Sequence, residues 1–123
     1  MGRRSRQRAR EQKLSAPTTD YRSAEGDVLT LRGAMTPATR REYAEVRRAG
    51  SGRPGASQDD AWQRSVEFLF ERLAIRWEIA GAPLDTQQEL LGRFRAASPN
   101  ERAWIRGVMR EHLAEWFPDV QAP

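Results

Sequence analysis

An apolar stripe between residues 62 and 80 constrains the fold of this chain more than any other feature of its sequence. Its members follow one another at intervals of three or four residues: Trp62, Val66, Leu69, Leu73, Trp77 and Ala80. Such spacing places side chains on one face of an amphipathic helix, so we expect a helix over about 58–80. Phe68, Ile75 and Ile79 form a second stripe on another side of that helix. A helix with two apolar sides either lies at the centre of a bundle or exposes one side as a binding surface.

Residues 74–79 also allow a second interpretation. Ile75, Trp77 and Ile79 alternate with Arg76 and Glu78, and a period of two is typical of a strand with one buried face. We prefer the helix, because the stripe continues unbroken to Ala80, and we keep the strand as the alternative.

The remaining elements follow from turn and cap signals. Leu29 and Leu31 share one face of a short β-hairpin, and Gly26 supplies its turn. Thr36-Pro37 and Ser98-Pro99 are helix starts, each with a capping hydroxyl followed by proline, and Asp85 begins a further capping pattern. The expected fold class is mainly α, with a hairpin followed by four helices packed as a small bundle. The expected hairpin covers 21–33, and the helices cover about 37–49, 58–80, 86–97 and 99–117.

Charge divides the chain into two parts. Residues 1–13 carry six basic side chains and one acidic one, whereas residues 14–123 carry 15 basic and 16 acidic ones. We therefore expect residues 1–20 to be a disordered basic arm and linker, and residues 21–123 to form a single, mainly helical domain. The arm is either a phosphate-binding segment for nucleic acid or a solubilising tail. Its basic side chains are Arg3, Arg4, Arg6, Arg8, Arg10 and Lys13.

Composition excludes several classes of function. The chain has no cysteine and one histidine, His112, which excludes disulfides, thiol catalysis, zinc sites built on cysteine and any site needing two histidines of one chain. No apolar run approaches the ~20 residues that cross a bilayer, and the arm lacks the apolar core of a secretory signal. We expect a cytoplasmic protein without cofactor or metal. Lys13 is its only lysine, so nearly all of its basic residues are arginine. This preference for arginine reflects either actinobacterial-type high-GC codon usage or selection for arginine–phosphate contacts.

Three further features each carry a functional and a structural interpretation. His112 is a general base or pH sensor, or a buried histidine with its hydrogen bonds satisfied. Asp59 and Asp60 bind a divalent cation or cap a helix start. The four tryptophans pack in the core or anchor a protein interface. We favour the structural interpretation for each.

Four phrases mark the expected layout: Val28–Arg32, Thr36-Pro37, Trp77–Pro83 and Leu90-Leu91. With these phrases the chain resembles the small tail assembly chaperones of long-tailed, siphovirus-type bacteriophages over about residues 21–117. The resemblance implies a non-enzymatic phage protein that binds the long helical tape-measure protein and keeps it soluble while tail-tube subunits assemble around it. The basic arm is not part of this resemblance.

Two hypotheses of function follow. The first is a non-enzymatic assembly factor whose exposed apolar residues Phe68, Ile75 and Ile79 hold an amphipathic helix of a protein client, with self-association as an additional option. The second is an adaptor that binds nucleic acid without sequence preference through the arm. A carboxylate-dependent enzyme is the third, weakest alternative, because no two carboxylates are placed together by the sequence.

Overall fold

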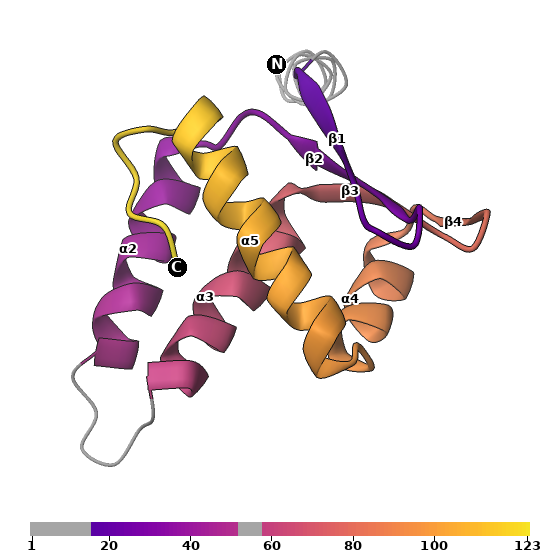
Figure 1. Cartoon of the computed structure of the whole chain (residues 1–123). Helices are drawn as coiled ribbons and strands as arrows, with labels where there is room; N and C mark the ends of the chain where they lie inside the picture. Colours follow the sequence, from indigo (N-terminus) through magenta and orange to yellow (C-terminus); the bar gives the residue numbers. More distant parts are fainter. Residues whose placement is uncertain (1–15, 52–57) are drawn as a thin grey trace.

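The computed structural model describes residues 16–51 and 58–123, which fold into two layers (Figure 1). A four-stranded antiparallel sheet forms one layer, and the helices cover one of its faces. In chain order the elements are β1 (Thr18–Arg22), β2 (Val28–Arg32), α2 (Pro37–Ser51), α3 (Gln58–Leu73), β3 (Ala74–Ile79), β4 (Ala82–Leu84), α4 (Gln87–Arg95) and α5 (Pro99–Trp116).

The sheet corrects the expected fold class. The chain is mixed α/β rather than a mainly helical bundle, because β3 and β4 extend the N-terminal hairpin into a sheet ordered β1-β2-β3-β4. Thr18 to Asp20, expected to be linker, belong to β1. Leu29 pairs with Trp77, and both side chains are almost fully buried. A lone hairpin is only marginally stable in water, so the second pair of strands gives the first a partner and a longer buried face.

The expected helix over 58–80 ends seven residues early, at Leu73, and residues 74–79 form β3, the alternative interpretation. The two patterns agree at Trp77, because a helical step of four from Leu73 and a strand alternation from Ile75 both turn that side chain inward. The free β2 edge decides between them. Pairing with Val28–Leu31 satisfies the β3 backbone and buries Trp77 against the sheet's inner face.

A bulge and a tight turn complete this region. Leu31 pairs with Ala74 and Thr30 with Arg76, so Ile75 is the extra residue of a bulge next to the end of α3. Ala80 and Gly81, with φ of 50° and 81°, link β3 to β4. Two successive residues with positive φ are the signature of a type I′ hairpin turn, which reverses the chain where the sequence pattern had continued the helix.

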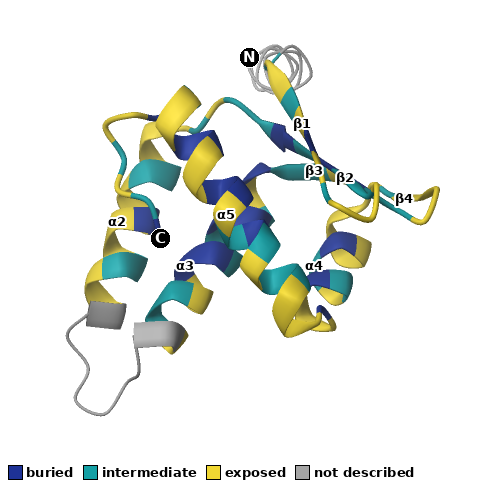
Figure 2. Ribbon diagram, in the orientation of Figure 1, coloured by how far each residue is buried: buried dark blue, intermediate teal, exposed yellow. Residues whose placement is uncertain are grey.

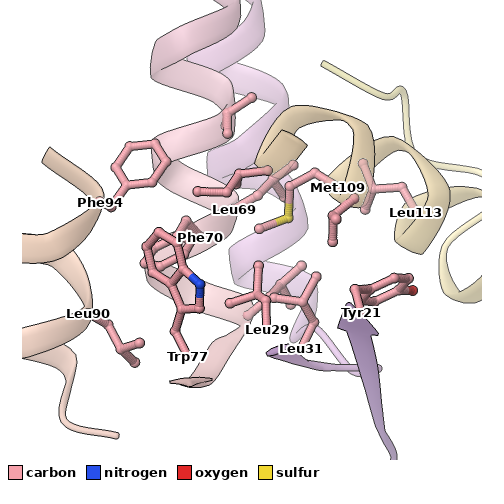
Figure 3. Packing of buried hydrophobic residues seen from close by; sticks show 14 of the residues in the cluster. Tyr21, Leu29, Leu31, Leu69, Phe70, Trp77, Leu90, Phe94, Met109 and Leu113 are labelled. Carbon is pink, nitrogen blue, oxygen red and sulfur yellow. The ribbon is translucent and has the colours of Figure 1, made fainter. Parts of the chain in front are cut away.

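The core lies between the sheet and the helices. The darkest residues in Figure 2 cluster on the inner sides of α3 and α5 and on the central strands. Figure 3 shows Trp77 beside Phe70, with Phe94 reaching toward them from α4. The Phe70 ring is stacked on Phe94 at 4.8 Å and meets Trp77 edge-on at 5.7 Å. These three aromatic rings join α3, α4 and β3.

The helix starts are largely as expected. Thr36 accepts a hydrogen bond from the Thr39 amide at the start of α2, and Ser98 and Glu101 form a complete capping box at the start of α5. The α4 start differs by one residue, because Thr86 rather than Asp85 is the N-cap.

Candidate functional site

An arginine-lined groove runs between α2 and the segment that follows α5. Its volume is about 600 Å³, and its lining includes Arg40, Arg47 and Arg48 from α2 and Asp119 and Val120 from the segment. Positions 40, 47 and 48 fall on one side of α2 because seven or eight residues make about two helical turns. In Figure 1 this segment returns between α2 and α5 toward the C-terminus.

Side chains hold the segment by its backbone. The Tyr43 hydroxyl donates to the Gln121 carbonyl at 2.7 Å, and the Arg47 guanidinium donates to the Ala122 carbonyl at 2.6 Å. Arg106 and Arg110 of α5 reach the Pro123 carbonyl at 3.4 Å. These contacts fix one wall of the groove.

Arginine is the commonest residue type among the described residues that line the groove. Asp119 is the one carboxylate among the described residues that line it, and it pairs with Arg40 at 2.8 Å. Arg48 also has a partner within the chain. The partner of Arg47 is a neutral carbonyl, and its buried Nε has no hydrogen-bond partner within the described residues. The helices α2 and α5 also carry the exposed residues Glu45 and Glu111. The arrangement suits an anion with several oxygen acceptors.

His112 is fully buried in a hydrogen-bonded network and does not line the groove. Its Nε2 lies 2.8 Å from the Arg32 carbonyl, which only accepts, so Nε2 carries the proton. Its Nδ1 therefore accepts from the Tyr21 hydroxyl, also at 2.8 Å. Burial lowers the pKa of His112, and burial reinforced by Glu115 and Glu111 raises the pKa of Tyr21 to about 12. The structure confirms the buried, satisfied histidine.

The three residues expected to form an apolar patch do not share a helix face. Phe68 lies on α3, where its ring stacks on Tyr43 at 6.1 Å beneath the Arg72 guanidinium. Ile79, at the far end of β3, packs against the core, and Ile75 occupies the bulge. All three are half-buried. The patch was derived from one continuous helix, and that helix ends between Phe68 and Ile75.

The structure says less about the other residues that were expected to form sites. The arm residues, from Arg3 to Lys13, lie outside the described residues, as does the Asp59 side chain, and Asp60 has a partner within the chain. Of the tryptophans, Trp77 is buried, whereas Trp62 is partly exposed beneath the Arg106 guanidinium at 3.6 Å. The described residues contain no cluster of three or more His, Asp or Glu side chains placed to bind a metal ion. No helix among them is long and apolar enough to cross a bilayer.

The groove is the feature that sequence analysis missed. The seven-residue spacing of Arg40 and Arg47 was available as a signal of one basic helix face. Its second wall depends on a contact between residues about 75 positions apart, such as Arg47 and Ala122, and nothing in the local pattern indicates it.

Comparison with protein-family models, curated proteins and solved structures found no match to this chain. The resemblance to phage tail assembly chaperones thus stays a prediction drawn from the sequence. One phrase behind it has a different structure from the one expected, because Trp77–Pro83 covers β3, the turn and β4 rather than a helix end.

Proposed function

We propose that this protein binds nucleic acid without sequence preference, with the basic arm as its main contact. The observation that carries the proposal is the charge division of the sequence, in which 13 residues hold six of the 21 basic side chains and one of the 17 acidic ones. Lysine and arginine side chains on phosphates release condensed counterions, which supplies most of the affinity of non-specific binding. The arginine-lined groove adds basic surface on the folded body.

Salt dependence tests this function. We expect the full chain to bind a short labelled DNA duplex with a log–log salt slope of about −5, because five or six phosphate contacts each contribute about −0.9. A full-length arm variant in which Arg3, Arg4, Arg6, Arg8, Arg10 and Lys13 are all replaced by Gln should lose most of that slope.

The control is the folded state of the arm variant, measured by circular dichroism and thermal unfolding. These should match the unaltered chain, because the core among the described residues is built from Tyr21 onward, after the replaced residues and the start of β1. Failure of the full chain to bind duplex at low salt would refute the proposal, and an unchanged slope in the arm variant would refute the role of the arm.

The protein-client hypothesis stays a prediction with its own test. Replacing Phe68 and Ile75 by Asp should abolish capture of a helical client while helix content survives. Phe68 contacts Tyr43, so collapse of the fold in Phe68→Asp would assign that residue to packing between α2 and α3. Ile75→Asp at the bulge is then the sharper probe of a surface.

A further inference from the structure

We propose that the outer edge of β1 is a docking site for an extended segment of a partner protein that carries lysine or arginine at every second residue. The segment adds a fifth strand to the sheet, a recognised mode of peptide binding. Figure 1 shows β1 in indigo at one edge of the sheet. The inference concerns the folded body and does not depend on the binding of nucleic acid.

The backbone of β1 has bonding groups that face away from the sheet. Just before the strand, the Gly33 amide donates to the Pro17 carbonyl at 2.7 Å. Just after it, the Ser23 amide donates to the Asp27 carbonyl at 2.8 Å. The pairing of β1 with β2 is regular between these two bonds. Because bonding alternates along an antiparallel strand, every second residue of β1 turns its amide and carbonyl outward. The outward-facing residues are Thr18, Asp20 and Arg22.

The opposite edge of the sheet is closed to such pairing. β4 has three residues, and Pro83 is the middle one. Ile79 and Ala82 close the tight turn as a hydrogen-bonded pair, so the outward-facing position that follows is Pro83. Proline has no amide hydrogen, and on an edge strand it prevents pairing with a further strand. β1 contains no proline, so β1 is the edge that can accept one.

The helix α5 keeps step with β1 on the inner face of the sheet. The Tyr21 hydroxyl donates to His112 at 2.8 Å. The Trp116 indole donates to the Thr19 hydroxyl at 2.9 Å. Four residues along the helix, about 6 Å, therefore match two residues along the strand, about 6.5 Å.

Two carboxylates on α5 give this edge its charge preference. Glu111 and Glu115 are exposed, and both lie near enough to the Tyr21 hydroxyl to raise its pKa. They are four residues apart, so basic side chains at every second position of an added strand have the spacing to meet both. A second copy of the chain fits less well, because antiparallel pairing of two β1 strands brings the same carboxylates of both copies together, and like charges repel.

The test measures peptide binding to the full-length arm variant, so that the basic residues of the arm do not compete. The probe is a labelled, end-blocked octapeptide of alternating lysine and threonine. Two further peptides carry N-methyl groups on either the lysine amides or the threonine amides. Only alternate amides of a strand face its neighbour, so one methylated peptide should lose binding and the other should retain it.

A matched pair of protein changes tests the charge preference. Glu115→Gln removes a carboxylate at the edge, and Glu45→Gln removes an exposed one on α2. We expect Glu115→Gln to weaken binding of the alternating peptide by about two- to five-fold, and Glu45→Gln to have a smaller effect. Circular dichroism and thermal unfolding check that both variants are folded.

Amide hydrogen exchange locates the bound peptide. On binding, exchange should slow at the outward-facing amides of Thr18, Asp20 and Arg22. It should change little at Thr19 and Tyr21, whose amides already bond to β2.

Three results would overturn the inference. The first is no binding of the alternating peptide at low salt, or equal binding of the two methylated peptides. The second is an equal effect of Glu115→Gln and Glu45→Gln, because the peptide would then respond only to net charge. The third is slow exchange at the outward-facing amides of the unaltered chain without peptide, because residues of this chain or of a second copy would then cover the edge.

Discussion

Replacing Tyr21 by Phe should lower the free energy of unfolding more than replacing Tyr43, the other tyrosine of the chain, by Phe. The Tyr21 hydroxyl donates to His112 Nδ1 at 2.8 Å, and the His112 Nε2–H is committed to the Arg32 carbonyl at the same distance. The imidazole therefore cannot change tautomer to relieve the loss. His112 has no exposed surface, so water cannot replace the hydroxyl. A buried acceptor left without a donor costs about 1–3 kcal/mol. Because the substitution leaves the aromatic ring of residue 21 in place, we expect a loss of stability of this size.

Tyr43→Phe is the matched comparison. Tyr43 is even more buried than Tyr21, at 1% against 8% exposed, but its hydroxyl donates to the carbonyl of Gln121, an exposed residue. Water can hydrate that carbonyl after the change, so we expect a smaller loss of about 0.5–1.5 kcal/mol. Urea unfolding of the two variants and the unaltered chain gives both values from shifts in midpoint at constant slope. An equal or smaller loss for Tyr21→Phe would refute the assigned tautomer and the buried network.

Three further changes test other parts of the fold. Ala80→Gly should leave urea stability unchanged or raise it by up to about 1 kcal/mol, because glycine accepts the positive φ of the turn; a loss of about 1 kcal/mol would instead indicate a helix at this position. Gly33→Ala would place a methyl group 2.8 Å from a Trp116 ring carbon, and a loss of about 1–3 kcal/mol in thermal unfolding is expected. Since burial lowers the pKa of His112, the unfolded chain takes up a proton that the folded chain does not. Thermal stability should fall as pH drops below about 6.5, and an NMR titration of this imidazole should give a lower midpoint; a higher midpoint would contradict its buried neutral state.

The helix starts and the inward faces could be predicted because their signals are local. Thr36 and Ser98 satisfy amides within three residues of themselves, so a short stretch of sequence contains both donor and acceptor. Leu29 and Leu31 were expected on one face of a strand, and both are buried. Proline after each cap reinforces these starts because its fixed φ suits a first helical turn.

The strand over 74–79 could be named only as an alternative, because both periodicities bury Trp77. The partner that favours the strand, Val28–Leu31, lies more than 40 residues earlier in the chain. The apolar patch failed as a unit for the same reason, since Phe68 and Ile75 share a face only if the helix continues. The groove likewise required contacts of α2 with Gln121 and Ala122.

By itself the sequence determined where helices begin, which residues turn inward and how charge divides the chain, because caps, periodicity and composition act over a few residues. Only the tertiary structure decided that α3 ends at Leu73, that four strands make one sheet and that arginines of α2 meet the segment after α5. Each of these depends on satisfying backbone groups or burying side chains against partners far away in the chain.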